Sequence, residues 1–153
     1  MRNVCTVLLF LLLAGCSAEG RLAARAADYY SFMAGHAGGT KYSGFLSPAF
    51  RKTMGKDGLR TYDTAIKPGV AGKVRYPKAK GSDITSAIDG RFALTVANPA
   101  LGDVYKQQRS TKWVRVGTVW YIYWNSDAER KAYGAFPVGM KPPVYEAKGE
   151  RGT

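Results

Sequence analysis

The stretch KWVRVGTVWYIYW, residues 112–124, decides the fold of this 153-residue chain. Valine, tryptophan and tyrosine, which favour β-strands, lie on both sides of Gly117-Thr118, a pair suited to a tight turn. The pattern predicts a β-hairpin with strands over about Val104–Val116 and Val119–Trp124. Because side chains alternate between the two faces of a strand, most of these rings are predicted to be core residues, and a minority to line the mouth of a pocket.

Working outward from this hairpin, three shorter strands are predicted before it. Asp83–Ile88 and Arg91–Asn98 flank Asp89-Gly90, a favoured turn pair, and Gly72–Tyr76 is a short strand that ends at Pro77. Strands joined by turns this short pair in antiparallel fashion.

Helices are predicted before the strands. In Glu19–Ala34 apolar side chains recur at helical spacing. Ser47-Pro48 is a typical helix start, because the serine caps free N–H groups and proline fits the first turn. It opens a helix over Pro48–Met54, and a second one follows over Asp57–Ile66. Helices that precede an antiparallel sheet define an α+β fold, with the N-terminal helices packed on one sheet face.

The first fifteen residues, MRNVCTVLLFLLLAG, have the pattern of a secretory signal. One basic residue, Arg2, precedes an apolar run over Val4–Ala14. As a helix this run would rise about 16 Å, roughly half of the hydrocarbon thickness of a bilayer, so a stable transmembrane span is not expected.

Leu13-Ala14-Gly15-Cys16 resembles the lipobox of bacterial lipoproteins. The resemblance implies cleavage before Cys16, a diacylglyceryl group on its sulfur, and acylation of the new amine by a fatty acid such as palmitate. Two or three acyl chains anchor a protein durably, whereas one alone does so marginally. Ser17 after the cysteine favours the outer over the inner membrane, on the periplasmic side. The alternative is an ordinary signal peptide cut after Ala18.

Cysteine usage agrees with this interpretation. The only other cysteine, Cys5, lies in the leader, so the mature chain offers Cys16 no intramolecular disulfide partner. The chain is therefore predicted to contain four segments: a signal peptide (1–15), a lipidated tether (16–20), an α+β domain (21–124) and an extended or flexible tail (125–153).

The predicted tail differs from the domain in composition. After Trp124, prolines, glycines and scattered charges replace the aromatic and β-branched residues. One helical turn is predicted at Asp127–Ala132, and the rings of Tyr133, Phe136 and Tyr145 are candidates to hold the tail against the domain.

Two stretches resemble the nuclear transport factor 2-like superfamily. FLSPAFRKTM, residues 45–54, is similar to the second-helix region of its small secreted members, and residues 112–124 are similar to their closing hairpin. The resemblance spans about residues 20–124 and implies a cystatin-like α+β cone, in which a curved sheet wraps around the N-terminal helices. Members range from isomerase-like and dehydratase enzymes to binding and assembly modules, so the fold alone selects no function.

Enzymes that this fold resembles place acid–base carboxylates inside the cone, often with a tyrosine. Here no Asp or Glu lies within residues 91–98 or 104–124, and no catalytic residue is predicted. Asp28 and Tyr30 are the one candidate pocket pair, with a solvated aspartate as the alternative. The sole histidine, His36, lies in a glycine-rich loop without cysteine or carboxylate neighbours, so neither a metal site nor another cofactor is predicted.

The chain is basic, with 23 Lys and Arg against 11 Asp and Glu. Lys73 and Arg75 on the first strand, with Arg109, Lys112 and Arg115 on the long one, are predicted to form a positive patch if these strands lie together. Such a patch attracts acidic lipid surfaces or acidic proteins. A solvated surface is the alternative, and nucleic acid is not expected as a partner because an exported chain rarely meets it.

These observations favour a non-catalytic, lipid-anchored protein of the bacterial cell envelope. Its domain is expected to bind a protein partner or a small apolar ligand. Two alternatives stay open: an isomerase- or lyase-type enzyme that uses the cone pocket, and an accessory subunit of an envelope complex.

Overall fold

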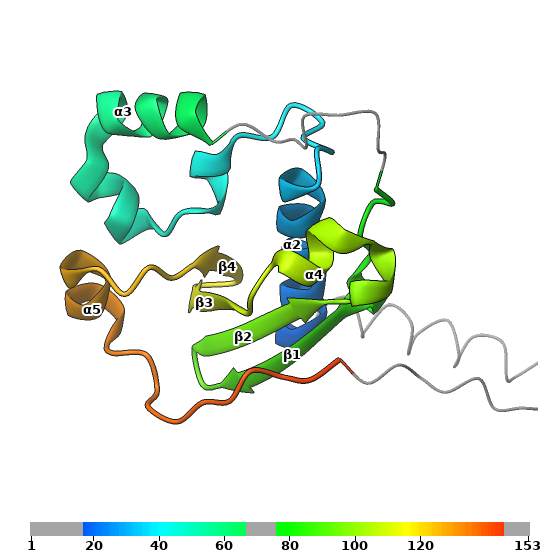
Figure 1. Ribbon diagram of the computed structural model, residues 1–153. Helices are drawn as coiled ribbons and strands as arrows, with labels where there is room; N and C mark the ends of the chain where they lie inside the picture. The colour runs from blue at the N-terminus through cyan, green and yellow to red at the C-terminus, as the bar shows by residue number, and fades with distance from the viewer. Residues whose placement is uncertain (1–16, 67–75, 146–153) are drawn as a thin grey trace, which may run out of the picture.

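The computed structural model describes residues 17–66 and 76–145 of the chain. Figure 1 shows a four-stranded antiparallel sheet in the order β1-β2-β3-β4, with helix α2 (Ala18–Met33) against one face. The strands are β1 (Ile84–Asp89), β2 (Phe92–Ala97), β3 (Thr111–Val116) and β4 (Val119–Ile122). The other helices are α3 (Pro48–Ala65), α4 (Asp103–Gln107) and α5 (Asp127–Tyr133), with short 3-10 turns η1 (Tyr42–Phe45), η2 (Gly81–Asp83) and η3 (Pro99–Leu101).

The fold is α+β, with helices on a curved antiparallel sheet, as predicted. This arrangement is compatible with a nuclear transport factor 2-like fold. The strand predicted at residues 72–76 falls, except for Tyr76, outside the described residues, as do the leader, Cys16 and residues 146–153. Among the helices that the structure describes, none combines the length and the apolar character needed to cross a bilayer.

The predicted hairpins are confirmed. Val116 pairs with Val119 across the β3–β4 turn, where Gly117 has a φ of 62°. Asp89 pairs with Phe92 across the β1–β2 turn, where Gly90 has a φ of 59°. Both glycines take left-handed conformations that tight hairpin turns require and that other residues adopt at a cost.

The predicted helix starts and breaks are confirmed as well. The Ser47 side chain accepts a hydrogen bond from the Phe50 N–H at 3.3 Å, and Pro48 occupies the first turn of α3. Gly55, with φ 65° and ψ 177°, divides α3 into the two helices that the sequence predicted.

The single long strand predicted over Val104–Val116 is wrong in its first half. Residues Asp103–Gln107 form α4, and only Thr111–Val116 are strand. Tyr105 is buried and its hydroxyl donates to the Pro77 carbonyl at 2.6 Å. Tertiary packing of this aromatic ring on a helix therefore overrides the β propensity of the sequence.

The sheet is apolar on both faces. Toward α2 it presents Trp113, Trp120 and Ile122, which pack with buried side chains of that helix. On the opposite face, Phe92, Val114 and Tyr123 form a second cluster. The alternation of neighbours such as Trp113 and Val114 between these clusters explains why the hairpin is aromatic throughout.

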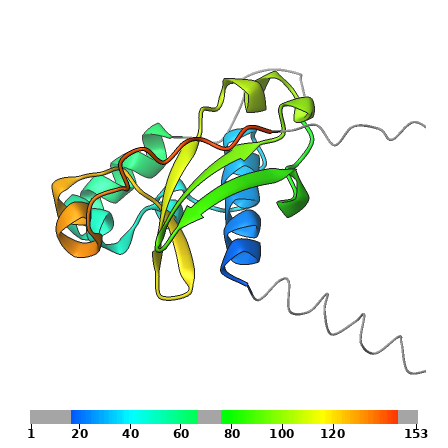
Figure 2. The same ribbon diagram turned by 90° about the horizontal axis from the view of Figure 1, so that it is seen from below.

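Residues 125–145 continue the domain beyond β4. The turn predicted at 127–132 is present as α5, whose N-terminus is closed by a capping box of Ser126 and Glu129. The following segment crosses the sheet face opposite α2 (Figure 2), where Phe136 packs 5.4 Å from the Phe92 ring and 5.9 Å from the Tyr123 ring, measured between centroids. With residues 146–153 outside the described part, the tail as a unit stays a prediction.

Candidate functional site

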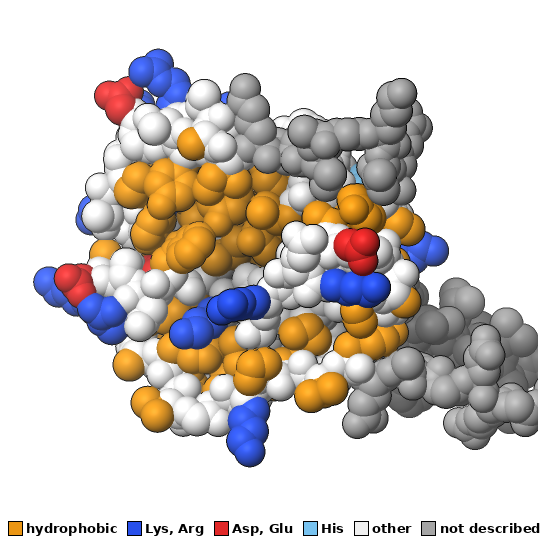
Figure 3. Space-filling model, in the orientation of Figure 1, with side chains coloured by type: hydrophobic (Ala, Val, Ile, Leu, Met, Phe, Trp, Pro, Cys, Tyr) orange, Lys and Arg blue, Asp and Glu red, His pale blue; other side chains and the backbone are white. Residues whose placement is uncertain are grey.

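A cavity of about 390 Å³ opens where the C-terminal half of α2 meets the end of β4. Tyr29 and Met33 of α2 and Ile122 of β4 form its apolar floor, residues 108–112 form one wall, and residues 123–125 form the rim. Figure 3 shows this region as a hollow of hydrophobic side chains below α3, with Lys and Arg side chains along its lower edge.

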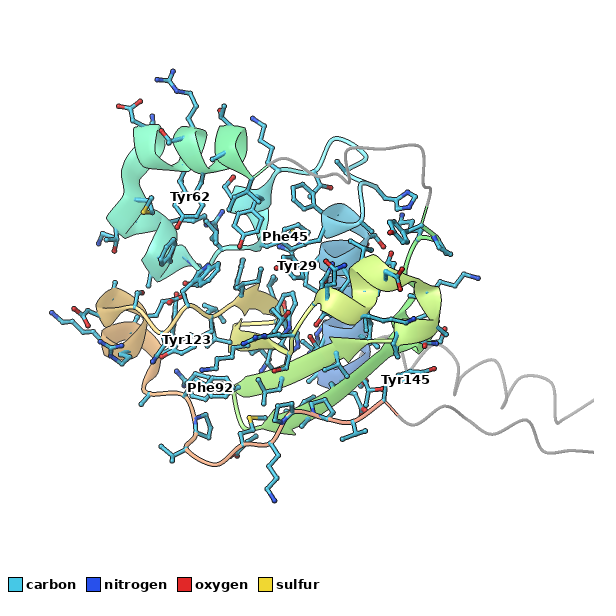
Figure 4. The ribbon with its side chains drawn as sticks, in the orientation of Figure 1. Tyr29, Phe45, Tyr62, Phe92, Tyr123 and Tyr145 are labelled. Atoms are coloured by element: carbon cyan, nitrogen blue, oxygen red, sulfur yellow. The ribbon has the colours of Figure 1, made fainter. Side chains whose placement is uncertain are left out.

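Tyr29 lies at the centre of an aromatic cluster (Figure 4), with ring centroids 5.4 Å from Phe45 and 5.8 Å from Trp113. The pKa of Tyr29 is raised to about 12, mainly by burial and to a lesser extent by the neighbouring Tyr30. The hydroxyl is protonated at neutral pH, and Tyr29 presents a neutral surface to the cavity.

Helix α3 borders the hollow with side chains that are only half buried. Tyr62 stacks on Tyr42, with centroids 6.2 Å apart and an interplanar angle of 16°, and Phe50 meets Tyr62 edge-on. An apolar helix face that is partly open to solvent beside a cavity is typical of ligand-binding regions.

Trp124 is the most exposed aromatic side chain at the rim. In β4, Trp120 and Ile122 face α2, and Trp124 continues this alternation beyond the end of the strand. Its backbone N–H donates to Glu129 Oε2 at 3.0 Å, while its side chain remains 50 % exposed. The backbone is thus fixed by α5 and the indole ring is left uncovered.

The cavity also carries polar groups. The Oε1 atom of Gln108 is buried and has no hydrogen-bond partner within the described part of the chain. Arg109 is exposed at the wall, and the ion pairs recorded among the described residues do not include it. No Asp, Glu or His belongs to the described residues that line the cavity.

The candidate pair Asp28 and Tyr30 is not brought together. Asp28 is exposed on α2, whereas Tyr30 is fully buried. The Tyr30 hydroxyl donates to the Thr95 carbonyl at 2.8 Å and lies 3.1 Å from the Thr111 hydroxyl. Tyr30 therefore cross-links α2 to the sheet, and neither residue lines the cavity.

The predicted basic residues are distributed over different places. Lys73 and Arg75 lie outside the described residues. Lys112 Nζ lies 5.0 Å from the Phe136 centroid, in the cluster opposite α2, whereas the Arg115 guanidinium lies 5.8 Å from the Trp120 ring on the α2 side. Residues an odd number apart on one strand face opposite ways, so Lys112 and Arg115 cannot share a patch.

Arg109 and Lys112 do both line the cavity. Sequence reasoning missed Gln108, because it placed this residue within a strand. A minority of the hairpin rings was predicted to line the mouth of a pocket. Trp124 is one of the hairpin rings, but no local signal distinguished it from Trp120.

A second, wider groove of about 700 Å³ lies at the opposite end of α2. Its lining comes from the start of α2, from η2 and from β1. It consists mainly of small and hydroxyl-bearing residues together with Glu19 and Ile84, and Tyr145 borders it (Figure 4). It lacks the aromatic floor of the first cavity. Within the described residues, no cluster of three or more His, Cys, Asp and Glu is placed to hold a metal ion, and His36 Nε2 lies 2.6 Å from the Tyr76 carbonyl oxygen.

Comparison of the chain with protein-family models, curated proteins and solved structures found no match. The chemistry of the aromatic cavity is therefore what indicates a function.

Proposed function

We propose that this chain is a lipid-anchored protein of the bacterial envelope whose domain binds a small apolar ligand without transforming it. The observation that carries the proposal is the cavity of about 390 Å³ with its floor of Tyr29, Met33 and Ile122. Small-molecule sites in proteins are concave, mostly apolar and about 300–1000 Å³ in volume. The half-exposed ring of Trp124 offers a stacking surface at the entrance.

Binding is favoured over isomerase or lyase catalysis by the composition of the cavity lining. Proton transfer requires an acid or base within hydrogen-bond reach of the substrate. The described lining residues include no carboxylate or imidazole, and the raised pKa of Tyr29, about 12, makes its phenol a poor base at neutral pH. Asp28, the one carboxylate considered from the sequence, is exposed outside this lining.

The proposed anchor is Cys16, acylated after cleavage of residues 1–15. Helix α2 begins at Ala18, with Ser17 as its cap, so Cys16 lies two residues before the helix. Tyr29 and Met33 come 11 and 15 residues after Ala18, a helical rise of about 17–23 Å. The cavity is therefore at the end of α2 that is farther from the anchor.

A second candidate function is that of an accessory subunit in an envelope complex. The observation that favours it is the exposure of Val138 and Val144 in the segment after α5, two apolar side chains that a partner could cover. Recovery of the membrane-anchored protein together with a fixed stoichiometric partner would support this candidate, and recovery of the protein alone would count against it.

The anchor is tested by intact-mass analysis of the full chain produced in a bacterium and extracted from its membranes. We expect a chain that starts at Cys16 and carries a diacylglyceryl group. Cys16→Ser should abolish the lipid mass, whereas the matched variant Cys5→Ser should leave it unchanged, because Cys5 is removed with the leader. A mature chain that starts at Glu19, or an uncleaved one, would refute the anchor.

Ligand binding is tested by fluorescence titration with N-phenyl-1-naphthylamine, an uncharged aromatic amine that brightens in apolar surroundings. We expect one saturable site. Trp124→Ala should weaken its affinity about fivefold or more by removing a stacking surface. Val138→Ala, a truncation of an exposed residue that does not line the cavity, is the control. Absence of saturable binding, both of this probe and of its acidic analogue 8-anilinonaphthalene-1-sulfonate, would refute the proposed function.

A further inference from the structure

We infer that the aromatic cavity takes an apolar anion. This inference rests on the proposed ligand-binding function and names the class of ligand. It follows from two properties of the cavity: its uncompensated positive charge and its neutral apolar floor.

The first property is charge. Arg109 lines the cavity and is exposed. It takes part in none of the ion pairs between described residues, each of which joins two side chains three positions apart in the same helix. No carboxylate belongs to the described lining residues. A guanidinium presents a planar fork of donors that matches carboxylate, sulfonate or phosphate oxygens. An anionic group is therefore the favoured partner at this wall.

The second property is the neutral apolar surface that would hold the rest of the ligand. Met33 and Ile122 are uncharged, and the Tyr29 phenol is protonated at neutral pH, as is usual for a tyrosine. The apolar body of the ligand would lie on this floor, and Trp124 would cover its outer side. None of these three side chains repels an anion, and none of them can form an ion pair with a cation.

The test compares N-phenyl-1-naphthylamine with 8-anilinonaphthalene-1-sulfonate, which has the same aromatic amine scaffold and adds an acidic group beside the N–H. Both are titrated against the folded protein and against Arg109→Gln. We expect this variant to weaken binding of the sulfonate about five- to tenfold while the uncharged amine changes less than about twofold. Raising the salt concentration should likewise weaken only the sulfonate.

Lys106→Gln is the matched control, because it removes the same charge three residues away at an exposed position that does not line the cavity. It should change neither affinity. Far-ultraviolet circular dichroism on each variant distinguishes lost binding from lost folding. If Arg109→Gln affects both probes equally, or neither of them, the anionic class is refuted while ligand binding still holds. If neither probe binds saturably, the proposed function itself fails.

Discussion

Glu129 shows how one residue joins three parts of this molecule. Its side chain is fully buried, and Oε1 accepts a hydrogen bond from the Ser47 hydroxyl at 2.6 Å, at the start of α3. Oε2 accepts from the Trp124 and Ser126 N–H groups and from the Ser126 hydroxyl, at the start of α5. A buried carboxylate is tolerated here because its oxygens are fully hydrogen-bonded and sit at a helix N-terminus.

We therefore expect Glu129→Ala to lower the free energy of unfolding by about 3 kcal/mol, since hydrogen bonds to a charged group are lost and buried donors remain unpaired. Urea denaturation measures this. Asp127→Ala in the same helical turn is the control, because Asp127 is exposed and, among the residues that the structure describes, forms an ion pair only with the nearby Arg130. A surface ion pair is worth about 1 kcal/mol at most, so equal losses in both variants would contradict this role of Glu129.

Tyr29 makes the stability sensitive to alkaline pH. Its pKa is raised to about 12 in the folded chain, mainly by burial, against about 10 for an unfolded tyrosine. Folding thus favours the protonated phenol, so this contribution is fully present below pH 10 and is lost as the pH rises through 12. The shift corresponds to about 2–3 kcal/mol.

The measurement is urea denaturation of the native chain and of Tyr29→Phe between pH 8 and pH 11.5. The native chain should lose stability above about pH 10, more steeply than the variant, because phenylalanine does not titrate. Burial also raises the pKa values of Tyr30 and Tyr42, so the variant should retain part of the decline. Identical profiles for the two proteins would contradict the assignment to Tyr29.

At the scale of elements, local sequence signals predicted most of the fold. The Ser47-Pro48 start of α3 and the Asp89-Gly90 turn depend on neighbouring residues alone, and both are confirmed. α4 was missed because Val104 and Tyr105 favour strands in isolation, whereas their burial in the domain depends on contacts distant in sequence. A pocket mouth was predicted, but most of the lining residues were missed for the same reason: Tyr29 and Met33 lie 75 residues or more before the wall at 108–112.

Gly102 directly precedes α4, the helix whose residues the sequence predicted as the first half of a long strand. Its φ of 133° is rarely adopted by other residues, and a Cβ atom there would lie 2.5 Å from Cδ1 of Tyr76. We expect Gly102→Ala to destabilise the protein by about 2 kcal/mol or more through backbone strain and this overlap.

Thermal and urea unfolding of Gly102→Ala measure this effect. Gly44→Ala is the matched control, since no atom lies within 4 Å of its added Cβ and its φ is outside the left-handed range. We expect Gly44→Ala to change the stability by less than about 1 kcal/mol. A Gly102→Ala protein as stable as this control would show that the η3–α4 connection tolerates a side chain.

At the scale of the whole molecule, the two faces of the sheet have different roles. The cavity opens mainly on the face toward α2, with Trp124 at its rim, although Lys112 and Tyr123 of the opposite face also border it. The opposite face is closed by the segment after α5, where Phe136 contacts Phe92 and Tyr123, and the Tyr123 hydroxyl donates to the Gly134 carbonyl at 2.7 Å. Closing the second face in this way supports the sheet without occupying the cavity.

This division predicts that stability and ligand binding can be separated by two aromatic substitutions. Phe136→Ala should lower the free energy of unfolding by about 2–3 kcal/mol, because it uncovers the second cluster, and should leave the affinity for N-phenyl-1-naphthylamine unchanged. Trp124→Ala should instead weaken probe binding and change the free energy of unfolding little. Half of its side chain is already exposed, and the hydrogen bond from its backbone N–H to Glu129 is kept. Urea denaturation measures the free energy of unfolding of each variant, and probe titration measures its affinity for the probe. A Phe136→Ala protein that remains folded but binds the probe more weakly would mean that the outer face and the cavity are coupled through the sheet, and the two roles would then not be separable.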